Sequence, residues 1–548
     1  MELEQSFIAL IEQSIKTNWY LNALTDYKGI TLQYRDVARK IEKIHILLEN
    51  AGIEKGDKIA ICGRNSAHWT VTYLAVITYG AVVVPILHEF KADQVHNIVN
   101  HSEARLLFVG DQIWENLNEA AMPHLEGIIE LKDFGVPVSR SEKLAYARDH
   151  LNEIFGHKFP CRFRPDDISY EKEKSEDLAI INYTSGTTGY SKGVMLPYRS
   201  ILSNVLYCKE KIGLKAGDSV VSMLPLGHVF GMTFDFLYGF TAGAHLWFLT
   251  RMPSPKIIAE SFAEIRPRVI ACVPLIVEKI FKKNILPKVD NKLGKLLLHV
   301  PIISDKIKEL IKQKAMEVFG GNFIEIIIGG APFNAEVEAF LKKIGFPYTI
   351  AYGMTECGPI ICSSRWETLK LASCGKATSR MEVRIDSPDP KTHAGEIVCR
   401  GMNMMLGYYK NPEATAQIID ANGWLHTGDL GTLDEEGYVT VRGRSKNLLL
   451  TSSGQNIYPE EIESKLNNMP YVSESLIVLQ HEKLVALIYP DFDDAFAHGL
   501  QQTDIQKVME QNRIELNQQL PNYSQISKIK IHFEEFEKTA KKSIKRFM

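Results

Sequence analysis

The stretch Tyr183–Leu196 reads YTSGTTGYSKGVML and has the residue types of an anion-binding loop. Its glycines let backbone N–H groups approach an anion, its serine and threonine hydroxyls add donors, and Lys192 adds a mobile positive charge. This combination suits a polyphosphate. The strand-like LAIINY before the loop and GVML after it predict that the loop joins two strands, with a helix beginning near Tyr198.

The loop does not match a Walker A loop, which requires GxxxxGK followed by Ser or Thr. Ser191 stands five residues after Gly186, and Lys192 is followed by Gly193. A solvated surface loop of small residues is the simpler alternative for this stretch alone. Its interpretation therefore depends on the rest of the chain.

Predicted strands and helices alternate along the chain on both sides of the loop. DKIAICG precedes a helical pattern over Ala67–Tyr79, and the strand-like AVVVPIL and RLLFVG come later. Further on, EIIIGG leads into the helical APFNAEVEAFLKKIG and then into PYTIAYG. This rhythm predicts an α/β fold of mostly parallel sheets covered by helices.

The pattern of predicted secondary structure changes in the last third of the chain. From about Gly375, short strands and turns such as GEIVCRG and DEEGYVTVRG predict a β-rich subdomain over 375–443. A compact α+β segment follows, with a helix in YPEEIESKLNN, a hairpin in SLIVLQHEKLVALIYP and a helix near Asp504–Leu520. We therefore predict an N-terminal domain at 1–443 and a mobile C-terminal domain at 444–548, joined by a short hinge.

Composition excludes several classes of protein. With 548 residues, 45% hydrophobic content and a net charge of −3, the chain is an ordinary globular protein of at least two domains and not a basic nucleic-acid binder. Its eight cysteines form no CxxC pair, which indicates free thiols in a reducing compartment. The apolar run Thr70–Leu87 is broken by Gly80 and Pro85. We expect a cytoplasmic protein without a transmembrane segment; peripheral membrane contact and oligomeric state stay open.

Further motifs follow the loop in order along the chain. They are LPLGHVFG (Leu224–Gly231), IIIGGAP (Ile326–Pro332), AYGMTECGP (Ala351–Pro359), GEIVCRG (Gly395–Gly401), GWLHTGDLG (Gly423–Gly431) and GRSKNLLLTSSGQNIYPEEIE (Gly443–Glu463). Together with the loop they resemble the signatures of the adenylate-forming superfamily of acyl-CoA synthetases, luciferases and peptide-synthetase adenylation domains. The usual loop is [YF]TSGTTGxPKG, and Ser191 replaces the proline here. The resemblance covers nearly the whole chain.

The resemblance implies a reaction in which a carboxylate attacks the α-phosphate of ATP, and a thiol then takes the acyl group from the acyl-adenylate. Tyr352 would stack on adenine, Thr355 would bond a phosphate oxygen and Glu356 would ligate Mg²⁺, which prefers carboxylate oxygen. The residues implied to hold the β- and γ-phosphates are Thr184, Ser185, Gly186, Thr187, Thr188, Gly189 and Lys192.

The remaining motifs imply nucleotide contacts and a domain movement. Asp429 would accept both ribose hydroxyls, Arg444 would reach the ribose or a phosphate, and His228 would lie beside the substrate carboxylate. Without the resemblance, these three would be a turn cap, an interdomain ion pair and a core histidine. Three residues, Gly329, Gly330 and Ala331, would cover one face of adenine. Lys446 would be the hinge, and Gly454 would line the pantetheine tunnel for CoA.

The C-terminal signature departs from the family pattern PKTxxGKIxR. Here Glu537–Arg546 reads EKTAKKSIKR, which puts Ser543 at the position of the lysine that bridges the carboxylate and the α-phosphate. A one-residue slip would bring in Lys542, which we take as the catalytic lysine, with Lys541 and Lys545 beside it. A basic cluster that only contacts phosphate or solvent is the alternative.

The motifs look most like those of fatty acyl-CoA ligases. Gly353 leaves the acyl pocket open at a point where acetate-specific members carry tryptophan, and VFGMTFDFLYGF could line an acyl tunnel. We therefore predict AMP-forming ligation of a medium- or long-chain fatty acid to CoA, with ATP and Mg²⁺. Two alternatives stay open. One is aryl- or amino-acid activation for a carrier protein, with Asp235 anchoring an ammonium group; the other is a non-catalytic nucleotide-binding relic, suggested by Ser543.

Overall fold

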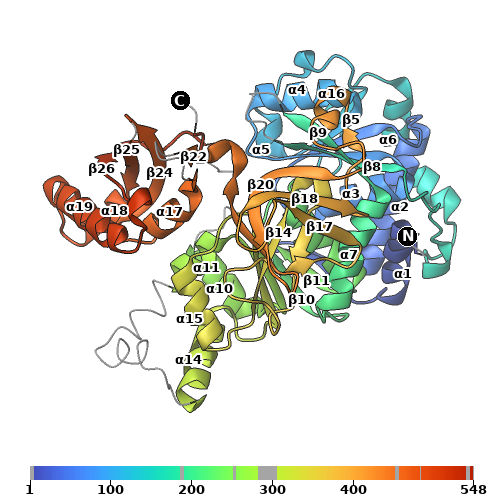
Figure 1. The fold of residues 1–548 in the computed structure, drawn as a ribbon. Helices are drawn as coiled ribbons and strands as arrows, with labels where there is room; N and C mark the ends of the chain where they lie inside the picture. Colours follow the sequence, from blue (N-terminus) through green and yellow to red (C-terminus); the bar gives the residue numbers. More distant parts are fainter. Residues whose placement is uncertain are drawn as a thin grey trace.

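The computed structural model describes residues 5–184, 191–250, 255–281, 305–450, 456–481, 483–538 and 544–546. Figure 1 shows a large body built from the N-terminal part of the chain and a smaller C-terminal part, coloured red, standing beside it. Within the described ranges, no helix combines the length and the apolar character needed to cross a membrane.

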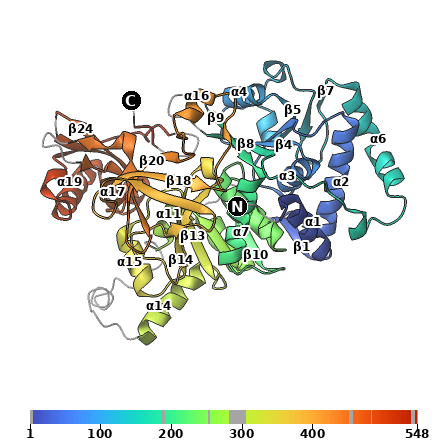
Figure 2. The same ribbon diagram turned by 45° about the vertical axis from the view of Figure 1, so that its right-hand side comes forward.

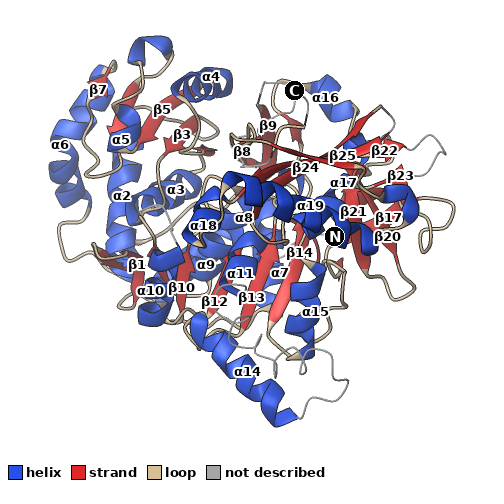
Figure 3. Cartoon of the chain, turned by 90° about the vertical axis from the view of Figure 1, so that its left-hand side faces the viewer, coloured by secondary structure: helices blue, strands red, loops and turns tan. Residues whose placement is uncertain are grey.

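The first sheet has nine strands in the order β16-β15-β14-β13-β12-β10-β11-β1-β2. Neighbours from β14 to β1 run parallel, and antiparallel strands close both edges. Figure 3 shows β10, β12, β13 and β14 side by side. The strands are β1 (Asn22–Asp26), β2 (Thr31–Gln33), β10 (Ser219–Ser222), β11 (His245–Phe248), β12 (Val269–Cys272), β13 (Glu325–Gly329), β14 (Tyr348–Gly353), β15 (Ile360–Ser363) and β16 (Lys376–Ala377).

The second sheet has eight strands in the order β19-β9-β8-β4-β3-β5-β6-β7. Its central strands are parallel, whereas β9, β19 and β7 run antiparallel to their neighbours. The strands are β3 (Lys58–Cys62), β4 (Val82–Ile86), β5 (Ala104–Val109), β6 (Gly127–Glu130), β7 (Val138–Ser139), β8 (Leu178–Thr184), β9 (Lys192–Pro197) and β19 (Gly407–Tyr408).

Helices cover both sheets and fill the space between them. The main core cluster combines side chains of α1, α2, α3, α7 and α9 with residues of both sheets. Figure 2 shows α2 beside α6, and the two are packed together. The longer helices are α1 (Phe7–Thr17), α2 (Tyr34–Asn50), α3 (Ala67–Tyr79), α4 (Ala92–Ser102), α6 (Glu142–Lys158), α7 (Tyr198–Lys211), α10 (Pro255–Ile265), α14 (Asp305–Val318) and α15 (Ala335–Lys343); the shorter ones include α9 (Tyr238–Thr241) and α11 (Pro274–Ile280).

The last third of the chain forms separate sheets. The stretch predicted to be β-rich contains a four-stranded antiparallel sheet of β17 (Met381–Asp386), β18 (Gly395–Gly401), β20 (Leu425–Leu433) and β21 (Val439–Arg444). Beyond it lie β22 (Leu449–Leu450) and β23 (Asn456–Ile457). The C-terminal core consists of α17 (Pro459–Leu466), β24 (Val472–Gln480), β25 (Lys483–Pro490), α19 (Gln502–Gln518) and β26 (Lys528–Ile531).

The predicted α/β fold class is confirmed, and the reasons are local. The expected helix 67–79 is α3, because the Ser66 hydroxyl accepts from the Trp69 N–H at its start and Gly80 takes a left-handed φ of 84° at its end. The apolar run Thr70–Leu87 is thus a buried helix followed by the buried strand β4, as predicted. All eight cysteines are free.

A buried carboxylate holds the segment after β15 against α15. The backbone N–H of Ala372 donates to both oxygens of Glu338, at 3.1 and 3.2 Å, and Tyr348 Oη donates at 3.3 Å. Burial raises the pKa of Glu338 from 4.5 to about 7. The folded protein therefore binds this proton more tightly than the unfolded chain does.

We predict that Glu338 makes stability depend on pH. Its contribution is complete below pH 4.5 and is lost as the pH rises through 7. In wild type, this group should lower the free energy of unfolding by up to about 3 kcal/mol between pH 5 and 8. E338Q should remove that part of the pH dependence. Urea unfolding across this range tests it, with E336Q on the exposed face of the same helix as control. Identical pH slopes for E338Q and wild type would contradict the prediction.

Candidate functional site

Three motifs meet at the carboxyl ends of parallel strands, where ligands bind in open α/β sheets. Gly329 ends β13 and pairs with Ala351 of β14, so IIIGG and AYGMTE are neighbours. A Cβ atom on Gly329 would lie 3.2 Å from Cζ of Phe230, which brings LPLGHVFG against the same point. Gly330 has φ +86°, and no atom lies within 4 Å of its ideal Cβ position. Gly330 and Ala331 are exposed, so an open surface lies at this strand end.

Tyr352, Asp429 and Arg444 form one connected group. Tyr352 Oη donates to Oδ2 of Asp429 at 2.7 Å, and Arg444 Nε lies 2.8 Å from Oδ1. Asp429 is buried on β20, whereas Arg444 on β21 is exposed. Burial raises the pKa of Asp429, and Arg444 and Tyr352 oppose that shift. The group joins β14 of the large sheet to the antiparallel sheet.

Glu356 and Lys192 are linked through Tyr408. Tyr408 Oη donates to Oε1 of Glu356 at 2.7 Å, and both side chains are buried. The ammonium of Lys192 stands 4.9 Å from the centre of the Tyr408 ring, within the range of a cation–π contact. The acid motif and the lysine of the phosphate-type loop are therefore brought together.

The flanks of that loop form the predicted pair of strands. Thr184 ends β8 and pairs with Lys192, the first residue of β9, and α7 begins at Tyr198 as expected. Five residues predicted to hold phosphates lie outside the described ranges: Ser185, Gly186, Thr187, Thr188 and Gly189.

His228 lies in a loop fastened by two buried asparagines. Asn65 donates to the Leu224 carbonyl at 2.7 Å and accepts from the Leu226 N–H at 3.0 Å, while Asn182 donates to the Gly227 carbonyl at 2.9 Å. The half-buried His228 accepts from the Phe230 N–H through Nδ1 at 3.2 Å. Because Nδ1 accepts, the neutral ring carries its proton on Nε2.

Thr355 and Glu356 share one turn of 3₁₀ helix over Thr355–Cys357, and Thr355 is buried. The predicted hinge residue Lys446 lies exposed in another such turn, Ser445–Asn447. Close to it, Asn447 Nδ2 donates to Oε1 of Glu460 at 2.6 Å. This contact ties the turn to α17.

The tail near the family's lysine position is fastened to the C-terminal core. Arg546 forms a bidentate ion pair with Glu463 on α17, and Lys538 pairs with Ile544 in an antiparallel bridge. Lys542 and Gly454 lie outside the described residues, so their predicted roles stay predictions.

Asp235 does not fit the alternative role of an ammonium anchor. It lies fully buried in a π-helical turn, Met232–Leu237, and its Oδ2 accepts from the Met223 and Leu224 N–H groups, both at 3.0 Å. Burial raises its pKa to about 8, so the carboxyl is mostly neutral at pH 7. Asp235 therefore acts as a cap on the end of β10.

Gly353 has a backbone reason to be glycine. A Cβ atom there would lie 1.9 Å from the Pro359 carbonyl oxygen, so a side chain would clash with the turn after the acid motif. An open acyl pocket is therefore not needed to explain this residue.

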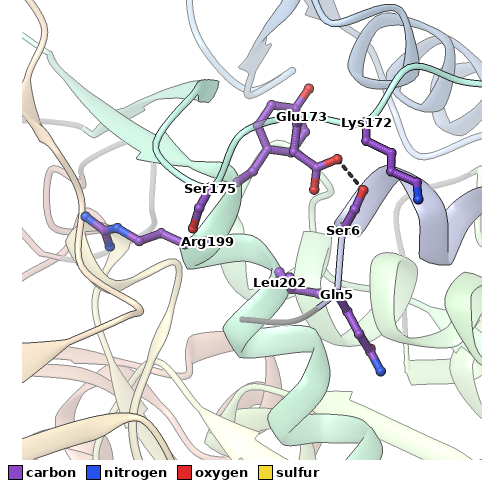
Figure 4. Close-up of a pocket in the computed structure, with 8 residues that line it drawn as sticks. Gln5, Ser6, Lys172, Glu173, Ser175, Arg199 and Leu202 are labelled. Carbon is purple, nitrogen blue, oxygen red and sulfur yellow. Dashed lines mark hydrogen bonds between the residues drawn. The ribbon is translucent and has the colours of Figure 1, made fainter. Parts of the chain in front are cut away.

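A separate pocket of about 220 Å³ lies at the start of α1. The Ser6 hydroxyl donates a hydrogen bond to Oε2 of Glu173 at 2.5 Å. Figure 4 shows this pair, with Arg199 pointing away from it. Glu173 also accepts from the Ile8 N–H, so it caps α1. The residues that line the pocket include none of the predicted site residues.

The donor set around Glu356 fits Mg²⁺. Within the described residues, no group of three or more His, Cys, Asp or Glu side chains could hold a metal by itself. Mg²⁺ is usually bound by one or two carboxylates together with substrate phosphates and water. Glu356 offers a buried carboxylate that shares Tyr408 as a neighbour with Lys192, and the Tyr408 hydroxyl donates to one of its oxygens.

Sequence reasoning overlooked several residues that hold the site together. Tyr408 lies in none of the motifs described above, and nothing in the sequence places it beside Glu356, 52 residues earlier. Asn65 and Asn182 carried no motif signal at all. The one available hint was that each stands at or near the carboxyl end of a predicted strand.

Comparisons with known proteins match the chain over most of its length. The family model described as AMP-binding enzyme matches residues 12–409, and that of the AMP-binding enzyme C-terminal domain matches residues 446–548. The human long-chain-fatty-acid–CoA ligase ACSBG2 is 29% identical over 83% of this chain and 71% of its own. Long chain acyl-CoA synthetase 3 of Arabidopsis thaliana is 28% identical over 84% of this chain and 74% of its own.

Solved structures share the fold. The anthranilate CoA ligase AuaEII in complex with anthranoyl-AMP superposes with a TM-score of 0.78 at 19% identity, covering 100% of this chain and 97% of its own. ATP-bound MatB from Rhodopseudomonas palustris gives 0.75 at 22% identity, covering 98% of this chain and 97% of its own.

We predict that D429N weakens ATP binding about 10- to 100-fold, because a charged acceptor buried between Tyr352 and Arg444 is lost. Calorimetric titration with a non-hydrolysable ATP analogue measures the effect. D434N, which changes a half-buried aspartate just beyond β20, is the matched control and should bind within twofold of wild type. Equal affinity of D429N and wild type would refute the assignment of Asp429 to the nucleotide.

Proposed function

The chain belongs to the AMP-binding enzyme family, and from this premise we propose that it joins a medium- or long-chain fatty acid to CoA. The relatives that match this chain are named as CoA ligases or acyl-CoA synthetases, which are AMP-forming acid–thiol ligases. The acid is inferred from the relatives that are named long-chain fatty acid–CoA ligases and align with more than four fifths of this chain. The observation that carries the activity is the joint placement of Glu356, Tyr408 and Lys192 beside Tyr352, Asp429 and Arg444.

The reaction has two displacements. A carboxylate oxygen of the acid forms a bond to the α-phosphorus of ATP, and the bond to pyrophosphate breaks. The deprotonated thiol of CoA then attacks the acyl carbon, and AMP leaves with its bridging oxygen. Leaving as AMP is easier than leaving as oxide, which is why the acid must be activated first.

In the first displacement, Lys192 and the loop after Thr184 would hold the phosphates that leave. Mg²⁺, when bound by Glu356, would neutralise charge on those phosphates. Tyr352 with Gly329, Gly330 and Ala331 would enclose adenine, and Asp429 with Arg444 would hold the ribose. The assignment is supported by the strand positions of Gly329, Tyr352 and Asp429, because groups held on strands need little rearrangement on binding.

Other residues would act at the acid and in the second displacement. His228 would lie beside the carboxylate, with its Nε2–H as the donor, and Lys542 would bridge carboxylate and α-phosphate. Rotation at Lys446 would turn the C-terminal domain so that Gly454 lines the thiol tunnel. A cytoplasmic location and an N-terminal domain ending at 443 belong to the same proposal.

The amino-acid alternative is less favoured, because Asp235 is fully buried and its Oδ2 already accepts from two backbone N–H groups. Aryl acids remain a second candidate, because the anthranilate CoA ligase shares the fold.

ATP–pyrophosphate exchange with fatty, aryl and amino acids tests the proposal. We expect exchange with fatty acids of medium or long chain, and a loss of at least 100-fold in K542A, since an electrostatic contact to the forming bond is removed. K541A is the matched control and should retain exchange within a few-fold. Exchange with aryl acids alone would contradict the proposed substrate class. Absence of exchange with every acid would contradict the proposed ligase activity. Exchange that survives in K542A but falls in K541A would reassign the lysine.

A further inference from the structure

Tyr408 occupies a position between the two groups that the proposed function assigns to the leaving phosphates. Its hydroxyl donates to Oε1 of Glu356 at 2.7 Å, and its ring carries the Lys192 ammonium 4.9 Å from the ring centre. Tyr408 is 6% exposed and Glu356 9% exposed, so water competes weakly for this hydrogen bond. No motif role was assigned to Tyr408.

The backbone around Tyr408 is fastened on both sides. Tyr408 pairs with Val194 of β9, and its N–H donates to the Thr415 hydroxyl at 2.8 Å. The Met405 N–H donates to the carbonyl of Glu356 itself, also at 2.8 Å. The same short segment therefore holds both the main chain and the side chain of Glu356.

Two further contacts fix this segment on the strand that carries Lys192. The Leu406 N–H donates to the Met195 carbonyl at 2.8 Å, and the Tyr409 N–H donates to the Gly193 carbonyl at 2.7 Å. Lys192, Tyr408 and Glu356 are thus held in one rigid arrangement. Rigid support of this kind keeps a ligand group in its binding geometry.

The chemistry of the hydroxyl restricts what it does. A phenol donates one hydrogen bond, and Tyr408 Oη gives it to Oε1 of Glu356. With Oε1 engaged, the carboxylate plane of Glu356 is fixed and its second oxygen is set for another ligand. Partners that orient a metal-binding carboxylate in this way tune the affinity of the metal.

We propose that Tyr408 is a positioning residue for the metal–nucleotide complex. Its hydroxyl orients Glu356 toward a divalent cation, and its ring holds Lys192 beside Glu356 until nucleotide phosphates draw the ammonium away. The inference rests on the proposed nucleotide site but not on the identity of the acid. Tyr408 touches neither the acid nor CoA in this scheme.

The test measures metal binding directly. Mn²⁺ binding to the full chain is followed by electron paramagnetic resonance in the presence of a non-hydrolysable ATP analogue and without any acid. Y408F removes only the hydroxyl, and we expect its Mn²⁺ dissociation constant to rise about 10- to 100-fold. Y409F makes the same change at the next residue, whose hydroxyl donates to the exposed Glu103 at 3.0 Å, and should stay within twofold of wild type. An unchanged constant in Y408F would overturn the inference.

A second variant separates the ring from the hydroxyl. Y408L should bind the metal-free analogue about threefold or more weaker than Y408F, because Lys192 loses its cation–π partner; equal affinities would overturn the role of the ring. Urea unfolding midpoints establish that each variant is folded.

Mn²⁺ binding by wild type without exchange on any acid would refute the proposed function, while loss of that binding in Y408F would still support the role of Tyr408. Absence of Mn²⁺ binding by wild type would overturn the inference itself.

Discussion

A buried carboxylate must be compensated, and Asp429 meets this requirement with residues from two other motifs. Leaving such a charge unpaired would cost several kcal/mol, so the tyrosine from β14 and the arginine from β21 are held where Asp429 needs them. The same contact joins the parallel sheet, the antiparallel sheet and the strand that runs into the predicted hinge. A structural necessity thereby gathers the residues that the family assigns to adenine and ribose.

A similar logic applies at the other end of the site. The segment 402–409 crosses between α7, the acid motif and β9, and its backbone groups form hydrogen bonds with these neighbours. Arg199 donates to the Met402 and Met404 carbonyls, and the Ser200 hydroxyl donates to that of Asn403. The site is built on strand ends and on this segment, so contacts within the protein fix the backbone that carries Glu356 and Lys192.

Sequence reasoning identified the elements that have local causes. The helix at 67–79 has its own cap and its own glycine stop, and the strands β13 and β14 have apolar periodicity and glycine ends. It failed where the cause is tertiary. Asp235 looked available as a ligand because burial cannot be read from the letters, and the close approach of the Pro359 carbonyl to Gly353 cannot be read from them either. Tyr408 carried no signal because its partner is distant in sequence. Lys542, Gly454 and the phosphate-loop residues 185–189 stay predictions.

The most direct measurement follows one oxygen atom. A fatty acid labelled with ¹⁸O in both carboxylate oxygens is incubated with the protein, ATP, Mg²⁺ and CoA, and the products are analysed by mass spectrometry. Because the carboxylate oxygen bonds to the α-phosphorus and departs with it, the account predicts AMP that contains one ¹⁸O atom, unlabelled pyrophosphate, and acyl-CoA that retains the other ¹⁸O. Release of ADP with ¹⁸O in inorganic phosphate would show attack at the γ-phosphate and would contradict the account.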